Sequence, residues 1–209
     1  MRIRPSIQLL ITSSLLVLTH LGHAEEASLS QKESQMTPTA IFAGGCFWCI
    51  EADFESVEGV IDVVSGYTGG SAETADYKTV TYTNSGHYEA VKVSYDPSLV
   101  DYSTLVDFFW RHIDPTDPEG QFCDKGASYR AAIFTQGLEQ RQIAEASLAR
   151  LETNKPFDAD IVTPILEAMP FYLAEDYHQD YYKKNPWRYK YYRAGCGRDR
   201  RVNALWGQG

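Results

Sequence analysis

A segment with two closely spaced cysteines, GGCFWC at residues 44–49, constrains the fold of this chain more than any other feature. The apolar run at residues 40–43 predicts a buried strand before it, and residues 46–56 repeat apolar side chains every three or four positions, as in an amphipathic helix. The glycine pair would form the turn from strand to helix and place Cys46 at the helix N-terminus. Because unpaired N–H groups there favour an anion, the sequence predicts a thiol with a lowered pKa that acts as a nucleophile.

The first 24 residues have the pattern of a secretory signal peptide. Arg2 and Arg4 precede a largely apolar stretch at residues 9–21, and small residues lead to a predicted cleavage site after Ala24. A membrane anchor is the alternative, but it needs about 20 uninterrupted apolar residues, and threonine, serine and histidine side chains interrupt this stretch. We therefore expect an exported protein, located in the periplasm, with no membrane segment after cleavage.

The rest of the chain is predicted to form one domain between two irregular segments. Residues 25–38 are polar and lack periodicity, which predicts a flexible lead. Residues 39–195 contain no low-complexity linker and no repeat, and their length suits a single domain with its own core. Residues 196–209 are predicted to form a coil tail.

The charge of the chain argues against one class of partner. Lysine and arginine number 19 against 28 acidic residues, and loss of Arg2 and Arg4 with the signal peptide changes the formal charge from −9 to −11. Binding of nucleic acid through its phosphates needs clustered basic residues, so we expect no nucleic-acid partner. The basic residues that do cluster, at residues 183–201, are interpreted as a solvated surface, with docking of an acidic partner as the alternative.

Apolar periodicity predicts strands that alternate with helices. Two of the strands are separated only by a glycine-rich loop and a short turn, which favours a mixed sheet. The sequence therefore predicts the α+β class: a mixed β-sheet packed with helices in a single domain of the two-layer sandwich type, with a long coil C-terminal tail. The predicted strands are residues 60–67, 88–95, 131–134 and 161–167, and the predicted helices are residues 46–56, 103–112, 138–151 and 174–184.

Seven short motifs are spread over residues 39–186. They are GGCFWC (44–49), GYTGG (66–70), YKTV (77–80), GHYEAV (86–91), FFWRHIDPT (108–116), DKGASYR (124–130) and FYLAEDYHQDYYKKNP (171–186). Through these motifs and their order, the chain resembles the A-type peptide methionine sulfoxide reductases, which are also called peptide-methionine (S)-S-oxide reductases. The resemblance implies a thiol-dependent oxidoreductase that reduces methionine S-sulfoxide, free or in proteins, and so repairs oxidised proteins.

The resemblance also implies roles for named residues. Cys46 is the expected nucleophile, which attacks the sulfoxide sulfur. Glu89 is the expected proton donor to the sulfoxide oxygen and must be uncharged near pH 7, and burial beside Phe47 and Trp48 would raise its pKa. These two aromatic residues would also form an apolar wall that receives the S-methyl group of the substrate.

Three further residues are expected at the same site. Tyr77 and Tyr129 match the family's phenols that hydrogen-bond the sulfoxide oxygen. Asp124 is expected either to contact the substrate or to hold a tyrosine. The family implies no bound cofactor and no metal, so electrons would come from a thioredoxin-like dithiol protein. The other partners would be oxidised proteins or peptides, and we expect a monomer.

The four cysteines leave the recycling step open. The family forms a sulfenic acid on the nucleophile, which a second thiol condenses into a disulfide. Cys196, between two glycines in the predicted tail, suits a mobile resolving arm, while Cys49 lies one helical turn from Cys46 and is the alternative. Because many relatives carry two tail cysteines and this chain carries one, we expect a single resolving step. Cys123 is predicted to be a small buried hydrophobic residue.

Other interpretations compete with this one. An exported chain with an even number of cysteines can form two structural disulfides. A strand, C-x-x-C and a helix also suit a thioredoxin-like disulfide exchanger, which would not need Glu89 or the two tyrosines. A zinc module would use all four cysteines, but it normally has a second close pair. The Glu175-x-x-His178 pair resembles half of a di-iron site, and we interpret it as structural.

Overall fold

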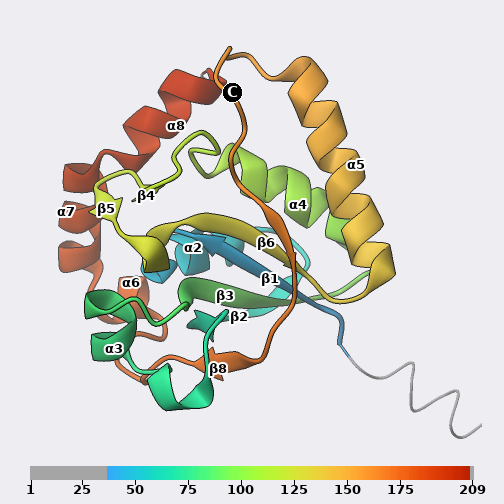
Figure 1. The fold of residues 1–209 in the computed structure, drawn as a ribbon. Helices are drawn as coiled ribbons and strands as arrows, with labels where there is room; N and C mark the ends of the chain where they lie inside the picture. The colour runs from blue at the N-terminus through green and yellow to red at the C-terminus, as the bar shows by residue number, and fades with distance from the viewer. Residues whose placement is uncertain (1–36, 208–209) are drawn as a thin grey trace, which may run out of the picture. The chain divides into compact units, whose positions relative to one another are not determined.

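The computed structural model describes residues 37–207 of the chain (Figure 1). The predicted signal peptide and residues 25–36 of the predicted flexible lead lie outside the described residues. Among the helices of residues 37–207, none is long and apolar enough to cross a membrane.

A mixed sheet forms the centre of the described part of the chain, and within it six strands pair in the order β7-β6-β1-β3-β2-β8. Neighbouring strands are antiparallel, apart from β6 and β7, which are parallel. A separate hairpin, β4-β5, precedes β6. The bounds are β1 Thr39–Gly44, β2 Val60–Thr68, β3 Tyr88–Tyr95, β4 Gly120–Gln121, β5 Asp124–Lys125, β6 Ala131–Thr135, β7 Ile165–Glu167 and β8 Phe171–Leu173.

Helices α2, α4 and α5 contact the strands of this sheet (Figure 1). Helix α4 begins where the Asp101 carboxylate accepts a hydrogen bond from the Thr104 N–H at 2.7 Å, and α3 begins in the same way with Asp76 and Thr79 at 3.0 Å. The bounds are α2 Phe47–Phe54, α3 Tyr77–Tyr82, α4 Tyr102–Arg111, α5 Leu138–Asn154, α6 Tyr181–Lys184, α7 Pro186–Cys196 and α8 Arg198–Trp206, with 3₁₀ turns η1 Ala72–Thr74 and η2 Ala127–Tyr129.

Alternation along β1 divides its side chains between the two faces of the sheet. Phe42 lies on the face that carries helices, where its ring stacks on Phe54 of α2 and Phe109 of α4 at centroid distances of 4.8 and 5.0 Å. Its neighbour Ile41 belongs to a smaller apolar cluster with Phe134 of β6. The larger core therefore lies between the sheet and its helices, which confirms the predicted α+β class.

The predicted coil tail after residue 195 is wrong, because this part of the chain is helical. Helix α7 continues to Cys196, Gly197 ends it with a left-handed φ of 72°, and α8 follows. The buried side chain of Arg198 donates hydrogen bonds to the carbonyl oxygens of Gly44 and His112, at 3.1 and 2.8 Å. These contacts to distant main-chain groups stabilise the tail, and local sequence does not reveal them.

Two arginines of the segment interpreted as a solvated surface are instead paired with a buried acid. Arg193 Nη1 lies 2.7 Å from Oδ1 of Asp53, and its Nη2 lies 2.6 Å from Oδ1 of Asp199. Arg198 Nε lies 3.5 Å from Oδ2 of the same Asp53. Because a buried carboxylate needs charged or hydrogen-bonding partners, these cations attach α7 and α8 to α2.

The predicted helix at residues 174–184 is only partly formed. Its last turn is α6, but the segment before α6 is not helical, and Asp180 has a left-handed φ of 53°. The Gln179 side chain joins the Ser65 main chain instead, with Oε1 accepting from the N–H at 2.9 Å and Nε2 donating to the carbonyl at 2.8 Å. Contacts with β2 thus replace helical hydrogen bonds here, since tertiary structure overrides local propensity.

Candidate active site

The turn from strand to helix places Cys46 at the start of α2. Gly45 has a positive φ of 82°, and a Cβ at this position would lie only 2.6 Å from Gln121 Cβ, so the turn requires glycine. Cys46 is the N-cap residue, and its carbonyl accepts the Cys49 N–H at 3.1 Å. The predicted turn and helix start are confirmed, and the Cys46 side chain is buried, with 7% of its surface exposed.

A buried carboxyl group from β3 lies next to this turn. Glu89 is 2% exposed, and its Oε2 accepts a hydrogen bond from the Phe47 N–H of α2 at 3.1 Å. Burial raises the pKa of Glu89 to about 8, although the Phe47 N–H acts in the opposite direction. The carboxyl group is therefore mostly neutral at pH 7, which is the state that a proton donor requires.

Cys46 and Glu89 line a common cavity of about 80 Å³. A cavity of this size holds a group of a few heavy atoms, since a single water needs roughly 10–15 Å³ by the same measure. The cavity walls contain the residues that we expected to act as the nucleophile, the proton donor and the two phenols. They also contain the two aromatic residues of the expected apolar wall and the expected aspartate. The lining residues are Cys46, Phe47, Trp48, Tyr77, Glu89, Asp124, Tyr129 and Tyr192.

The predicted low pKa of Cys46 is wrong. Burial raises the pKa of the Cys46 thiol well above its usual value, and the adjacent Cys49 and Glu89 raise it further. The hydroxyl of Tyr192 acts in the opposite direction. Desolvation thus outweighs the favourable position at the helix N-terminus, and the thiol is protonated at neutral pH.

Two of the predicted residues that line the cavity are tyrosines. Tyr77 is the first residue of α3, and its N–H donates to Glu175 Oε1 at 2.9 Å. Tyr129 ends the η2 turn that follows the β4-β5 hairpin. Burial raises the pKa of both phenols, and the charge of Glu89 adds to the effect. Both hydroxyl groups therefore remain donors at neutral pH, an arrangement that suits an oxygen acceptor in the cavity.

The indole of Trp48 is held by two residues that were not among the predicted site residues. Tyr181 stacks on it, with ring centroids 3.7 Å apart and planes inclined by 7°. Trp48 Nε1 donates a hydrogen bond to His178 Nδ1 at 3.0 Å. Burial lowers the pKa of His178 to about 4, so the imidazole is neutral at pH 7 and its Nδ1 can accept this bond.

The contacts of Glu175 and His178 agree with the interpretation of this pair as structural. Glu175 Oε2 accepts a hydrogen bond from the Tyr67 hydroxyl at 2.8 Å and lies 3.9 Å from His178 Nε2. Burial opposes ionisation of Glu175, but hydrogen bonds from Tyr77 and Tyr67 outweigh it and lower its pKa. The pair thus connects the Trp48 wall of the cavity with the first turn of α3.

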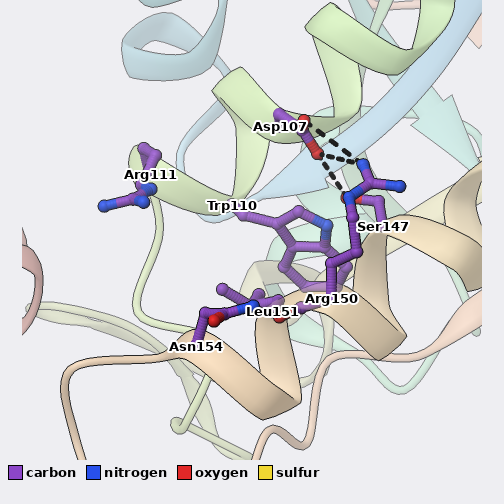
Figure 2. Close-up of a pocket in the computed structure, with 7 residues that line it drawn as sticks. All are labelled: Asp107, Trp110, Arg111, Ser147, Arg150, Leu151 and Asn154. Atoms are coloured by element: carbon purple, nitrogen blue, oxygen red, sulfur yellow. Dashed lines mark hydrogen bonds and ion pairs between the residues drawn. The ribbon is translucent and has the colours of Figure 1, made fainter.

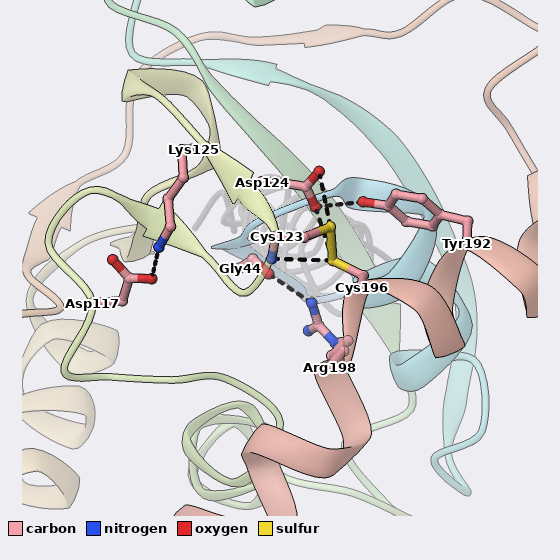
Figure 3. The surroundings of a disulfide bond; sticks show 8 residues. All are labelled: Gly44, Asp117, Cys123, Asp124, Lys125, Tyr192, Cys196 and Arg198. Atoms are coloured by element: carbon pink, nitrogen blue, oxygen red, sulfur yellow. Dashed lines mark hydrogen bonds and ion pairs between the residues drawn. A yellow bond between two sulfur atoms is a disulfide. The ribbon is translucent and has the colours of Figure 1, made fainter.

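Tyr192 of α7 completes the cavity, although it was not a predicted site residue. Its hydroxyl donates a hydrogen bond to Asp124 Oδ2 (Figure 3), and its ring meets Trp48 edge-on at a centroid distance of 5.8 Å. Asp124 therefore holds a tyrosine, one of the two roles expected of it. No local signal distinguishes Tyr192 among the 14 tyrosines of the chain, because its place depends on the docking of α7.

The four cysteines divide into two buried thiols and one disulfide within residues 37–207. Cys46 and Cys49 are free, and a hydrogen bond from Cys46 lowers the pKa of Cys49. Cys196, expected on a coil arm, ends α7 and is bonded to Cys123 (Figure 3). The predicted burial of Cys123 is wrong, since it lies exposed at the tip of the β4-β5 hairpin. The sulfur atoms of Cys123 and Cys196 lie with Asp124, and neither Cys46 nor Cys49 belongs to that cluster, which argues against a zinc site of four thiolates within residues 37–207.

A second hollow lies between α4 and α5 (Figure 2). It has a volume of about 260 Å³, and none of its lining residues belongs to the cavity at Cys46. Asp107 accepts a hydrogen bond there from Ser147 and lies 3.2 Å from Arg150, whereas the buried Nε1 of Trp110 has no hydrogen-bond partner. The hollow therefore offers neither a thiol nor a neutral acid, and the reactive groups lie at Cys46.

Comparisons with known proteins point to the same chemistry. The sequence profile of the peptide methionine sulfoxide reductase family matches residues 38–209. The peptide methionine sulfoxide reductase MsrA 2 of Caulobacter vibrioides is 54% identical over 172 residues, which cover 82% of this chain and 86% of that protein. The peptide methionine sulfoxide reductase MsrA of Bacillus subtilis is 49% identical over 174 residues, with 83% and 98% covered.

Solved structures agree with the sequence relatives. The reduced form of Mxr1 from Saccharomyces cerevisiae superposes with a TM-score of 0.62 and 31% identity, over 71% of this chain and 86% of that one. Methionine sulfoxide reductase A of Corynebacterium diphtheriae gives a TM-score of 0.61 and 32% identity, over 71% and 74%. The chain therefore belongs to the peptide methionine sulfoxide reductase family and is a thiol-dependent oxidoreductase that reduces methionine S-sulfoxide to methionine.

Proposed function

We propose that the cavity at Cys46 binds the sulfoxide group of methionine S-sulfoxide, free or in a peptide, and that Cys46 attacks its sulfur. The observation that carries this proposal is the meeting of one buried thiol and one mostly neutral carboxyl group in a cavity the size of a few heavy atoms. The S-methyl group would lie against the apolar wall of Phe47 and Trp48. The sulfoxide oxygen would face Glu89 and the two phenol hydroxyl groups.

Glu89 supplies the proton that the sulfoxide oxygen needs. As the Cys46 sulfur bonds to the sulfoxide sulfur, the oxygen gains negative charge, and the neutral carboxyl group donates a proton to it. The oxygen then passes to Cys46, methionine leaves as a thioether, and the thiol is oxidised by two electrons to a sulfenic acid. The proton that Cys46 loses restores the Glu89 acid. Tyr77 and Tyr129 stabilise the same oxygen and keep their own protons, because their pKa values are raised.

Cys196 is the proposed resolving thiol. It condenses with the sulfenic acid, water leaves, and a Cys46–Cys196 disulfide forms. The support is its place one helical turn after Tyr192 on α7, because residues four apart share a helix face and Tyr192 lines the cavity. Cys49 is the alternative resolving thiol. A thioredoxin-like dithiol protein then reduces the disulfide, and no bound cofactor takes part.

Methionine release from the two sulfoxide epimers tests the proposed function. Prereduced enzyme mixed with excess N-acetylated methionine S-sulfoxide, and with no reductant, should release at least about one equivalent of product, whereas the R epimer should give none. The physical reason is that proton donors and an apolar wall line one small cavity, so we expect only one configuration at sulfur to direct the oxygen to the donors and the methyl group to the wall. Equal release from both epimers would contradict the proposal.

Replacing His178 with alanine should loosen the Trp48 wall. The half-buried indole N–H would lose its acceptor, which costs about 0.5–1.5 kcal/mol of the free energy of unfolding. We expect the KM for the sulfoxide to rise more than kcat falls, because the reacting groups are unchanged. His178→Asn, which can still accept from Trp48, should restore part of the KM. His112→Ala, a histidine outside the cavity, is the control, and an equal rise in KM there would show that the effect is not local.

We also propose that the enzyme acts in the periplasm as a monomer. The support is the signal-peptide pattern of residues 1–24, which lie outside the described residues. Its partners would be exported proteins or peptides that carry methionine sulfoxide, together with a thioredoxin-like electron donor in the same compartment. N-terminal sequencing and light scattering of the exported protein test the cleavage site and the mass.

A further inference from the structure

We propose that the outer face of α7 binds the polypeptide chain that flanks methionine sulfoxide in a protein substrate, and that it favours chains with acidic residues. This inference rests on the proposed function and adds a preference among the substrates of the same cavity. The outer face consists of exposed side chains that are either aromatic or cationic, and it is termed the α7 face: Trp187, Arg188, Lys190 and Tyr191.

The cavity at Cys46 holds only the end of a substrate side chain. Its volume is about 80 Å³, whereas sites that enclose a whole drug-sized ligand measure roughly 300–1,000 Å³. When the sulfoxide belongs to a protein, the main chain on both sides of that residue therefore stays outside and crosses the mouth of the cavity. The surface around the mouth is consequently covered by the substrate polypeptide during each turnover.

Helix α7 borders this mouth. Cys46 and Glu89, at 7% and 2% exposure, form the floor of the cavity. Trp48, Tyr77 and Tyr192 also line the cavity but are half-buried, so they lie toward the mouth. Tyr192 belongs to α7, and its side chain points from this helix toward β5 (Figure 3). One side of the mouth is therefore formed by α7.

The α7 face begins next to Tyr192 and continues around the helix. Successive residues of an α-helix are rotated by about 100°, so Arg188 lies about 40° from Tyr192 around the axis. In the same direction, Tyr191 follows at about 100° and Trp187 at about 140°. The opposite side of α7 packs against the domain, and Tyr189 is buried there. A chain that leaves the cavity past Tyr192 therefore meets Arg188 first and the two aromatic rings next.

Two large aromatic side chains of the α7 face lie almost entirely in solvent. Trp187 and Tyr191 expose 83% and 84% of their surface, and they are four residues apart, so they are neighbours on the helix. The ammonium group of Lys190 lies 5.8 Å from the centre of the Trp187 ring. Tryptophan, tyrosine and arginine are the residues that contribute most binding energy at protein interfaces. The composition of the α7 face therefore suits binding of a polypeptide.

The charge of the α7 face selects acidic chains. Lys183 and Arg193, on either side of the face in sequence, each pair with two carboxylates. Arg188 and Lys190, in contrast, form no ion pair within residues 37–207. Complementary charge at an interface contributes mainly to specificity and to the rate of association. An acidic residue of the substrate would supply the partner that these two cations lack.

A few residues of substrate are enough to span the α7 face. Trp187 and Tyr192 are separated by about 8 Å along the helix axis, because an α-helix rises roughly 1.5 Å per residue. An extended chain advances about 3.3 Å per residue, so roughly three to five residues beyond the sulfoxide cover this distance and part of the helix width. Acidic residues at these positions, on one side of the sulfoxide, are the ones expected to contact Arg188 and Lys190.

Three peptides that differ only in charge test this preference. Each is about eleven residues long with a central methionine S-sulfoxide, and roughly three to five residues away on both sides it carries glutamate, glutamine or lysine. At low ionic strength kcat/KM should fall in the order glutamate, glutamine, lysine, by roughly two- to fivefold per contacted charge, and added salt should reduce the differences. Because the whole chain has a formal charge of −9, repulsion by its net charge alone would give the opposite order.

Substitutions then locate the effect on α7. Arg188→Gln should remove most of the advantage of the glutamate peptide and Arg188→Lys should keep part of it, while Arg141→Gln, at an exposed arginine of α5, is the matched control. Trp187→Ala combined with Tyr191→Ala should lower kcat/KM about fivefold for all three peptides, mainly through KM, and the two phenylalanine substitutions should restore most of it. N-acetylated methionine S-sulfoxide is too short to reach α7, so its kcat/KM should change by less than about twofold.

Equal kcat/KM for the three peptides, or the reverse order, would overturn the inference. So would a loss on the N-acetylated substrate as large as the loss on the peptides. If the variants slowed only turnover coupled to a thioredoxin-like reductant, and not peptide reduction in a single turnover, the α7 face would serve the electron donor instead. Failure of the parent enzyme to reduce the N-acetylated substrate would contradict the proposed function itself. The peptide comparison uses the parent enzyme, so it decides the matter even where a variant folds poorly.

Discussion

Cys46→Ser should abolish methionine release, with a fall in kcat on the order of 10⁶, the size of loss seen when an enzyme loses its covalent nucleophile. A serine hydroxyl is a poor nucleophile toward sulfur, and it cannot carry the oxygen away as a sulfenic acid. The measurement is a single turnover, in which the prereduced variant meets excess S-sulfoxide and methionine is quantified over hours.

Cys49→Ser is the matched control for this prediction. It makes the same change one helical turn later, at a position that is also buried, with 2% exposure against 7% for Cys46. The control should release its first methionine at a nearly parental rate, and both variants should keep the circular dichroism spectrum of the parent enzyme. Substantial release by Cys46→Ser would remove Cys46 from the reaction, and equal losses in both variants would indicate damage to α2.

Glu89→Gln should slow the release of the first methionine by about 10²–10⁴-fold, the usual contribution of a general acid. Glutamine keeps the size of the side chain and can still accept the Phe47 N–H, but its amide has no acidic proton to donate. An alkylating reagent should still modify the Cys46 thiol of this variant, because the substitution changes the proton donor and not the nucleophile. The rate is measured in a single turnover with saturating S-sulfoxide.

Glu51→Gln offers a matched control within α2. Glu51 is also buried, at 1% exposure, and burial raises its pKa to about 7, but it does not line the cavity. Its Oε1 accepts the Asp180 N–H at 3.1 Å, a bond that glutamine can keep. Glu51→Gln should therefore release methionine at a nearly parental rate. If Glu89→Gln matched that rate, the proton would have to come from another group.

The surroundings of Cys46 could be predicted because local rules decide them. Gly45 needs a positive φ, apolar spacing marks α2, and the strand predicted at residues 88–95 coincides with β3, which carries Glu89. The phenols and the aspartate could not be placed by periodicity, and only the family resemblance put them at the site.

The remaining features depend on contacts between distant segments. The site roles of Tyr192 and His178 require α7 and the segment before α6 to dock beside Trp48, and Cys123 meets Cys196 across a sequence separation of 73 residues. The pKa of Cys46 was mispredicted for a related reason. A helix N-terminus lowers it and desolvation raises it, and only the folded structure shows how deeply the thiol is buried.

The pH dependence of the sulfoxide step, expressed per Cys46 thiolate, tests the pairing of thiol and neutral acid most directly. With Cys49, Cys123 and Cys196 replaced by serine, Cys46 is the one cysteine left in the chain, so its thiolate fraction can be measured at each pH beside the rate of methionine release. The raised pKa of Glu89, about 8, means that the donor is protonated below this pH and ionised above it.

The rate per thiolate should therefore be constant up to about pH 8 and fall above it, and Glu89→Gln in the same background should show a low rate per thiolate that does not change with pH. A parental rate per thiolate that stays constant from about pH 7 to pH 10, or the same fall in Glu89→Gln, would contradict Glu89 as the proton donor.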